Sequence, residues 1–144
     1  MQNYKNHTRY FPLHHFLITP LTLIIMAWSL VNLFTLWETK EISQALYNIL
    51  IAFVLLLLPV LARIYALKTQ DRIIRLEMRQ RYFELTGTSF LKMEKKLRMS
   101  QIIALRFAGD EELIPLMEKA VKDKLKSNEI KKSIQNWQED RRRV

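Results

Sequence analysis

Two long uncharged stretches, residues 10–37 and 42–62, make up much of the first half of the chain. A helix rises about 1.5 Å per residue, so roughly 20 apolar residues are needed to cross the ~30 Å hydrocarbon layer of a bilayer. Residues 16–37 and 46–62 meet this length when their flanks are included. Neither segment has the polar face that a surface helix of a soluble protein shows. The sequence therefore predicts a two-span transmembrane helical hairpin.

The distribution of basic residues predicts how this hairpin is oriented. Its connector, residues 38–44, contains one lysine and two glutamates, whereas Lys5 and Arg9 precede the first span. Every basic residue after the connector lies from Arg63 onward. Because lysine and arginine near membrane ends favour the cytoplasmic side, we expect both termini to be cytoplasmic and the connector to lie outside.

The remainder of the chain has the composition of a basic helical tail. The formal net charge is +9, and nearly all of it comes from residues after 62. The chain has no cysteine, which excludes disulfides and thiolate metal sites. We expect an all-α fold in four parts. These are a cytoplasmic or interfacial N-terminal segment (1–15), the transmembrane hairpin (16–62), a basic helical extension (63–86) and a small cytoplasmic helical domain (87–144).

The second span is expected to continue beyond the membrane as one helix. Neither glycine nor proline occurs between residues 60 and 86, and the run around Gly87 then ends the helix. Two apolar stripes run along this extension. The larger consists of Ile64, Leu67, Ile74, Met78 and Tyr82, and the smaller of Tyr65, Ile73, Leu76 and Phe83.

Short helices are predicted for the small domain. A helical piece over residues 90–97 precedes a helix over 101–108, which Ser100 caps and Gly109 closes. A third helix runs from residue 110 to about 126 with acidic residues in its first turn, and a last one begins near residue 127. Pro115 near the first turn of the third helix could shift its start. We expect one small core formed by Leu105, Phe107, Leu113, Met117, Val121, Ile134 and Trp137.

Three segments give the chain a likeness to a known family. They are residues 103–113 (IALRFAGDEEL), 130–137 (IKKSIQNW) and 6–10 (NHTRY). With them the chain resembles, over nearly its whole length, an uncharacterised bacterial family that carries only a domain-of-unknown-function label. Members of that family are small two-span membrane proteins. The resemblance implies a protein of the bacterial inner (cytoplasmic) membrane, and it supplies no activity, ligand or catalytic residue.

Few residues could carry catalysis or bind a metal ion. The three histidines, His7, His14 and His15, all lie in the first 15 residues, and the apolar part of the second span has no His, Cys, Asp or Glu to meet them. No serine has a histidine and an acid in a recognised local arrangement, and two glycines leave no phosphate-binding loop. We therefore expect no enzyme, no cofactor and no metal site, since a metal site would require a second chain.

Four basic residues form a line on the helix after the second span. Lys68, Arg72, Arg75 and Arg79 are spaced i, i+4, i+7 and i+11, which places them within about 60° of one another around the helix axis. We call them the basic rail. One interpretation is that the rail binds an anionic partner: lipid headgroups, an acidic helix or RNA phosphate. The alternative is a solvated face, or one paired within the chain with the acidic residues Asp110, Glu111, Glu112 and Glu118.

Anionic lipid headgroups account for only part of the rail. Attraction to a charged membrane surface contributes ~1 kcal/mol per basic residue, which suits Lys68 and Arg72. Along a straight helix Arg79 lies ~16 Å beyond Lys68, farther than a physiological Debye length of ~8 Å. Lipid alone is therefore not expected to select all four cations.

Two asparagines, Asn32 and Asn48, lie within the predicted spans. In a tight antiparallel hairpin centred near residues 40–41 they fall at nearly the same depth, so their amides could hydrogen-bond across the pair. Each could instead reach the outer headgroups. Such bonds contribute only ~0.6 kcal/mol on average, so they would fix the register of the hairpin more than its stability.

Together these features favour a non-enzymatic accessory or scaffold subunit of a larger inner-membrane protein complex, docked through its spans and the basic rail. The connector is too short to bind much, and the tail is too small to bury a large core. The alternative is a membrane tether for ribosomes or nucleic acid, because a basic tail ending in three arginines, residues 141–143, can neutralise phosphates. Against this alternative, the tail has no recognised nucleic-acid module.

The predicted orientation can be tested with introduced cysteines, since the chain has none of its own. We expect Thr39→Cys in the connector to react with a membrane-impermeant thiol reagent added to intact cells. Lys122→Cys in the tail should react only after the membrane has been made permeable. Labelling of the tail cysteine in intact cells would show that the orientation is wrong.

Overall fold

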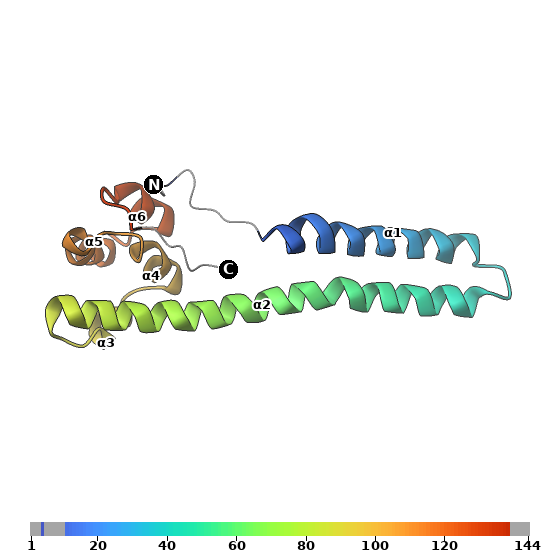
Figure 1. The fold of residues 1–144 in the computed structure, drawn as a ribbon, viewed down its shortest axis with the longest axis horizontal. Helices are drawn as coiled ribbons and strands as arrows, with labels where there is room; N and C mark the ends of the chain where they lie inside the picture. The colour runs from blue at the N-terminus through green and yellow to red at the C-terminus, as the bar shows by residue number, and fades with distance from the viewer. Residues whose placement is uncertain (1–3, 5–10, 139–144) are drawn as a thin grey trace. The chain divides into compact units, whose positions relative to one another are not determined.

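The computed structural model describes Tyr4 and residues 11–138, and every regular element among them is a helix (Figure 1). The all-helical prediction is thus confirmed for the described part of the chain. Contacts divide these residues into two compact units, 11–67 and 68–138 with Tyr4, and the boundary falls inside one helix. The elements are η1 (Leu13–Ile18, a π-helix), α1 (Thr19–Thr35), α2 (Ile42–Thr86), α3 (Leu91–Glu94), α4 (Met99–Leu105), α5 (Asp110–Lys122) and α6 (Ser127–Ser133).

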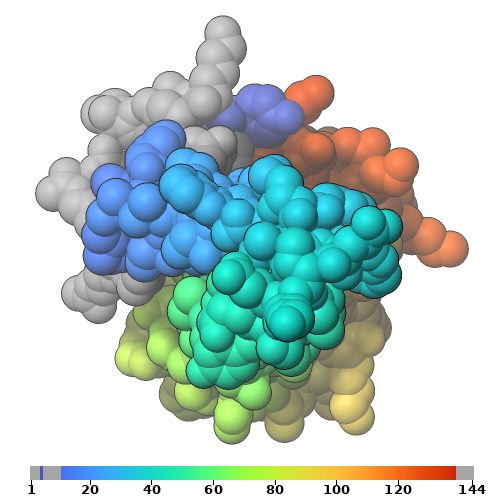
Figure 2. Space-filling view, turned by 90° about the vertical axis from the view of Figure 1, so that its right-hand side faces the viewer, coloured from blue at the N-terminus to red at the C-terminus, as the bar shows by residue number. Residues whose placement is uncertain are grey.

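The first unit is a hairpin of η1 and α1 against the first part of α2. Figure 1 shows these helices side by side with the connector at one end, and Figure 2 looks at them from that end. Two helical segments, Leu13–Thr35 and Ile42–Thr86, are long and apolar enough to cross a membrane. Most of their apolar side chains are exposed, including Trp28 at 69% and Phe34 at 76%. An apolar surface of this extent requires a cover, which a bilayer would provide.

Helix α2 is continuous over 45 residues, so the second apolar segment and the residues after it as far as Thr86 form one helix. Pro59 lies within the helix and does not end it. The helix ends at Gly87, whose φ of +67° is the left-handed conformation that glycine adopts most readily. The Gly87 N–H donates to the Phe83 carbonyl at 2.7 Å and so satisfies one of the last carbonyls of the helix.

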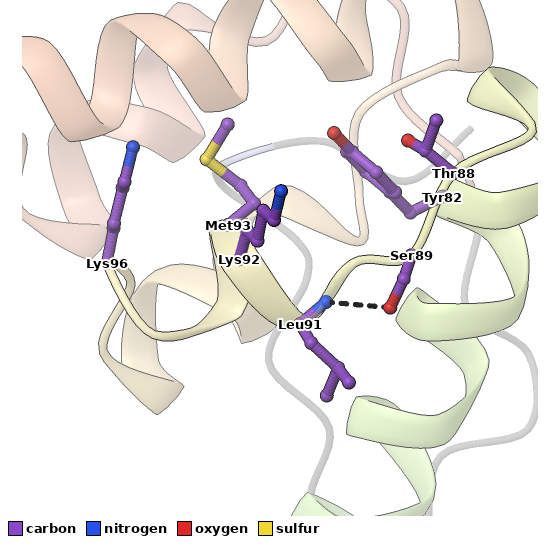
Figure 3. Close-up of a pocket in the computed structure, with 7 residues that line it drawn as sticks. All are labelled: Tyr82, Thr88, Ser89, Leu91, Lys92, Met93 and Lys96. Atoms are coloured by element: carbon purple, nitrogen blue, oxygen red, sulfur yellow. Dashed lines mark hydrogen bonds between the residues drawn. The ribbon is translucent and has the colours of Figure 1, made fainter.

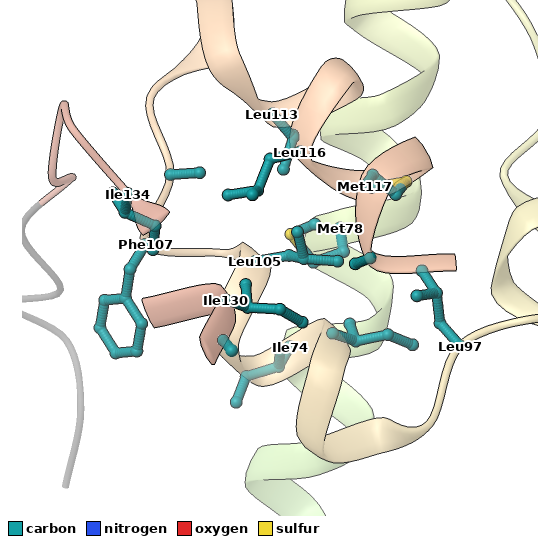
Figure 4. Close-up of a cluster of buried hydrophobic side chains, with 14 of the residues drawn as sticks. Ile74, Met78, Leu97, Leu105, Phe107, Leu113, Leu116, Met117, Ile130 and Ile134 are labelled. Atoms are coloured by element: carbon teal, nitrogen blue, oxygen red, sulfur yellow. The ribbon is translucent and has the colours of Figure 1, made fainter. Parts of the chain in front are cut away.

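The second unit is built around one apolar core (Figure 4). The predicted members Leu105, Phe107, Leu113, Met117 and Ile134 are all buried, and Val121 and Trp137 pack against them with part of their surface exposed. The larger predicted stripe of α2 contributes two more buried residues, Ile74 and Met78. The basic extension and the small helical domain therefore share a single core.

The predictions for Ser100 and Gly109 are wrong. Helix α4 begins at Met99, one residue before Ser100, and its first turn is closed by the Gln101 side chain, which accepts from the Arg98 N–H at 2.8 Å. Gly109 does not close α4 but precedes α5 as its N-cap, with an ordinary φ of −63°. A Cβ at this position would lie 2.9 Å from Nδ2 and 3.2 Å from the carbonyl oxygen of Asn136, so Asn136 would have to shift to accept any other residue.

Glu112 joins the start of α5 to the segment after α6. Its Oε1 accepts from the N–H groups of Gly109 at 3.3 Å and Asn136 at 3.0 Å, and its Oε2 accepts from the N–H of Gln135 at 3.0 Å. Beside it, residues Ala108 and Trp137 form an isolated antiparallel bridge. Pro115 is accommodated inside α5, which begins at Asp110 with no shift. The acidic first turn of α5 is thus part of the tertiary structure of this unit.

The assignment of the core can be tested with a matched pair of substitutions, Leu113→Ala and Leu91→Ala. Leu113 is fully buried and Leu91 is 51% exposed. We expect Leu113→Ala to lower the free energy of unfolding of the second unit by about 2–5 kcal/mol, through lost burial and a residual cavity. Leu91→Ala should change it by less than about 0.5 kcal/mol.

Hydrogen exchange of residues 110–122 in the full-length protein in mild detergent provides the measurement. Equal loss of protection in the two variants would show that the core has been assigned to the wrong side chains.

Candidate docking surface on α2 and α3

The structure divides the basic rail into two halves. Lys68 and Arg72 are exposed, and neither has an ion-pair partner within the described part of the chain. Arg75 and Arg79 both converge on the carboxylate of Glu94 in α3. Only the first half of the rail is therefore left with unpaired charge.

Glu94 is the centre of this ion-pair group. Arg79 binds it with two bonds, Nε to Oε2 at 2.6 Å and Nη2 to Oε1 at 3.0 Å, and the Nε of Arg75 lies 3.4 Å from Oε1. The Glu94 side chain is only 11% exposed, so its charge requires these partners. The hydrogen bond from Arg79 lowers the pKa of the Glu94 carboxyl, with a further contribution from the charge of Arg75. The same bond raises the pKa of the Arg79 guanidinium.

The acidic residue that pairs with the basic rail within the chain is Glu94, and not one of the acidic residues of α5 that the sequence suggested. The acidic residue at the start of α5, Asp110, is bound by Arg81, whose Nε lies 2.6 Å from Oδ1. Arg81 also donates to the carbonyls of Arg106 at 3.2 Å and Ala108 at 2.6 Å, and thereby satisfies backbone groups where α4 ends. Arg81 lies outside the rail, so the i, i+4 spacing gave no reason to select it.

A second group of cations lies on α3 and the turn after it, and the sequence analysis missed it. Lys92, Lys95, Lys96 and Arg98 are all exposed. We call them the α3 cations. The sequence could have revealed them by their local density, because four basic residues occur within the seven residues 92–98. The bidentate bond between Arg79 and Glu94 holds α3 against α2 and so fixes the position of these cations.

Two open pockets flank α3. The larger has a volume of about 630 Å³, and Figure 3 shows Lys92 and Lys96 on one side of it with Tyr82 and Thr88 across from them. The smaller, of about 280 Å³, places Lys95 beside Arg75 and Arg79. The larger pocket is lined by Tyr82, Thr88, Ser89, Leu91, Lys92, Met93 and Lys96. In such a pocket the apolar walls can contact apolar side chains of a partner protein, while the ammonium groups attract its carboxylates.

The two helices of the hairpin meet along small residues. Thr22 and Ser29 of α1, and Ala45 and Ala52 of α2, are the buried residues of this unit. Each pair is spaced by seven, as expected where two helix backbones pack closely.

Asn32 and Asn48 lie next to this interface and are half-buried. The Asn48 side chain accepts a bond from Gln44 Nε2 at 3.0 Å within its own helix. Pairing between Asn32 and Asn48 stays a prediction.

His14 and His15, the two histidines among the described residues, show no geometry that defines a metal site. His7 lies outside the described residues. His14 and His15 lie on η1 with ring centroids 5.0 Å apart, and His14 Nδ1 is 3.2 Å from the Thr19 hydroxyl oxygen. Within the described part of the chain, three or more His, Cys, Asp or Glu side chains do not gather around a common point. That the chain needs no metal or cofactor stays a prediction.

The Glu94 ion-pair group predicts a specific dependence of stability on pH. Because its pKa is lowered in the folded protein, Glu94 contributes stability that is complete above the ordinary glutamate pKa of about 4.3. That contribution is lost as the pH falls through the lowered value. At neutral pH we expect Glu94→Gln to cost about 1.5 kcal/mol, since the two arginines are partly in water.

Thermal unfolding of the full-length protein in detergent, followed from pH 7 to pH 3, tests this expectation. The difference between the unchanged protein and Glu94→Gln should shrink as the pH falls below about 4.3, because the stability that the ionised carboxylate contributes is then progressively lost. Glu111→Gln, at an exposed position of α5, is the matched control. A difference that persists unchanged at pH 3 would contradict the role of the ionised carboxylate.

The whole chain, residues 1–144, is matched by the model of a protein family described as "Family of unknown function (DUF6526)". No curated protein and no solved structure matches it. The predicted membership of an uncharacterised domain family is thereby confirmed. The chain belongs to the DUF6526 family.

Proposed function

We propose that this protein is a non-enzymatic accessory or scaffold subunit of a larger protein complex in the bacterial inner membrane. Its hairpin spans the bilayer with both termini in the cytoplasm, and its basic surface docks an acidic surface of the complex. The observation that carries the proposal is the group of exposed α3 cations, Lys92, Lys95, Lys96 and Arg98, which the ion pair between Arg79 and Glu94 fixes against α2.

The ion pairs define which cations are available to a partner. Arg75 and Arg79 are paired with Glu94, so their charges are used within the fold. Lys68 and Arg72 stay available, and anionic lipid headgroups are the ligands we propose for them. The docking surface for protein therefore centres on the α3 cations, whereas Lys68 and Arg72 lie at least 20 positions earlier in the chain, on α2.

The chemistry around α3 favours an acidic protein over nucleic acid. Binding of single-stranded nucleic acid relies on aromatic rings that are free to stack on bases. Tyr82, the aromatic residue that lines the larger pocket, packs on Phe90 with ring centroids 5.0 Å apart. Phe107 and Trp137 pack on each other in the core at 5.3 Å. The apolar walls of the larger pocket, Leu91 and Met93, suit protein side chains.

The second candidate is a membrane tether for ribosomes or nucleic acid. It is supported by the net charge of +9, which attracts phosphates without regard to sequence. The arginines at 141–143, on which this alternative partly depends, lie outside the described residues. Docking to a protein depends on where the cations lie, whereas phosphate binding depends mainly on how many there are.

Two charge reversals of equal size separate the candidates: Lys95→Glu with Lys96→Glu in the turn after α3 (the α3 variant), and Lys119→Glu with Lys122→Glu on α5. All four lysines are exposed, so both variants should fold. If α3 docks an acidic protein surface, only the α3 variant should lose its co-purifying membrane protein, by at least tenfold, because like charges now meet at the interface. Nuclease treatment should leave the capture unchanged.

Phosphate binding predicts a different pattern. It depends on the number of cations neutralised and falls steeply with salt, so both double variants should weaken it equally. Equal loss in the two variants, together with loss on nuclease treatment, would overturn the accessory-subunit proposal in favour of the tether.

A further inference from the structure

Helix α2 carries an apolar face that the described part of its own unit leaves uncovered. Ile73, Leu76 and Phe83 are 51%, 61% and 58% exposed. At 100° per residue they lie roughly opposite Ile74 and Met78, which are buried in the core of the same unit. One side of this helix therefore serves the fold, and the other has no cover within the described part of the unit.

The spacing of the uncovered face is that of a coiled coil. Thr69, Ile73, Leu76, Gln80 and Phe83 follow one another at intervals of four, three, four and three. Intervals of this kind keep a straight seam on one side of a helix that pairs with a second helix. We call these five residues the seam. The same spacing continues backward in the sequence of α2 to Ala66 and Ala62.

The residues at the two seam positions fit a two-stranded parallel pair. Ile73 takes the first core position of its heptad and Leu76 the second, a combination that favours two parallel strands over three or four. Gln80 takes the next first position. A polar residue at one such position sets the register of a pair at some cost in stability.

The charges beside the seam complement a second copy of the same helix. Arg72 immediately precedes Ile73, and Glu77 immediately follows Leu76, so they occupy the two flanking positions of the seam. In a parallel pair in register, Arg72 of one chain faces Glu77 of the other, and the reverse pair forms by symmetry. An antiparallel pair would instead set arginine against arginine and glutamate against glutamate.

Both flanking residues are available for this contact. Arg72 and Glu77 are exposed, and neither has an ion-pair partner within the described residues. Arg79 and Glu84 repeat the pattern one heptad later, although Arg79 is held by Glu94 of its own chain. Arg72 and Glu77 therefore provide the main selection for a second copy.

We propose that the protein forms a homodimer in which the seam of α2 pairs with the seam of a second copy, parallel and in register. Two copies inserted in one membrane with the same orientation present α2 in the same direction, as this pairing requires. The dimer does not depend on the proposed docking through the α3 cations, although it engages Arg72, one of the two cations that we assigned to lipid headgroups. It uses the seam, whereas the docking test changes Lys95 and Lys96 in the turn after α3.

Single cysteines in the full-length chain test the pairing, because the chain contains no other cysteine. In a parallel pair in register each seam residue lies next to itself, so Leu76→Cys and Phe83→Cys should both form disulfide dimers under mild oxidation of membranes from producing cells. Lys68→Cys, exposed on the same helix about 100° away from the seam, should form several-fold fewer.

A charge exchange tests the choice of partner. In the Phe83→Cys background, Arg72→Glu should lower the yield of disulfide dimer roughly fivefold, since two attractive pairs become repulsive. Adding Glu77→Arg should restore the yield, because the pairs are re-formed with the signs exchanged.

Three results would overturn the proposal. Yields at Leu76 and Phe83 no higher than at Lys68 would show that the seam faces lipid or another protein. A dimer through Leu76 but not Phe83 would show an antiparallel pair. Failure of the exchanged charges to restore the yield would show that Arg72 and Glu77 do not meet.

Discussion

The second unit depends on two apolar side chains that α2 contributes to its core. Ile74 and Met78 are 3% and 2% exposed and lie among residues from α4, α5 and α6. The helices after α2 are short, and a unit of this size buries too little apolar surface to be stable without additional contacts. Because α2 forms one wall of this core, the packing also fixes how the helix is rotated about its own axis relative to the rest of the unit.

That rotation decides what the other faces of α2 present. With Ile74 and Met78 turned inward, the basic rail lies on one flank and the seam lies nearly opposite the core. One helix therefore provides three surfaces with different chemistry: a buried apolar face, a cationic flank and an exposed apolar face. A second apolar face on a helix is unfavourable in water, so its presence indicates that lipid or protein covers it.

Electrostatics within the unit separates structural charges from available ones. Glu94 is nearly buried and would be costly without a partner, so it engages Arg75 and Arg79. Arg81 is committed in the same way to Asp110 and to two backbone carbonyls. The exposed lysines of α3 have no comparable role in the fold. Their exposed charges therefore indicate a binding partner more strongly than the charges of Arg75, Arg79 and Arg81 do.

Local rules of sequence predicted the helices of this chain more accurately than their contacts. The continuity of α2 to Thr86 and its end at Gly87 followed from the positions of glycine and proline. Apolar spacing identified five residues that are buried in the core. The role of Gly109 could not be read in this way, because its close neighbour, Asn136, lies 27 positions later in the chain.

By itself the sequence determined that the chain is helical, that two segments are apolar enough to cross a membrane, and that one helix carries a line of four cations. These are properties of periodicity and composition, which act over a few residues. Only the tertiary structure decided that Glu94 neutralises half of that line and that Arg81 binds Asp110. It also decided which stripe of α2 enters the core and which stays exposed. Such outcomes depend on which distant segments pack together, and the cost of burying an unpaired charge then selects the partners.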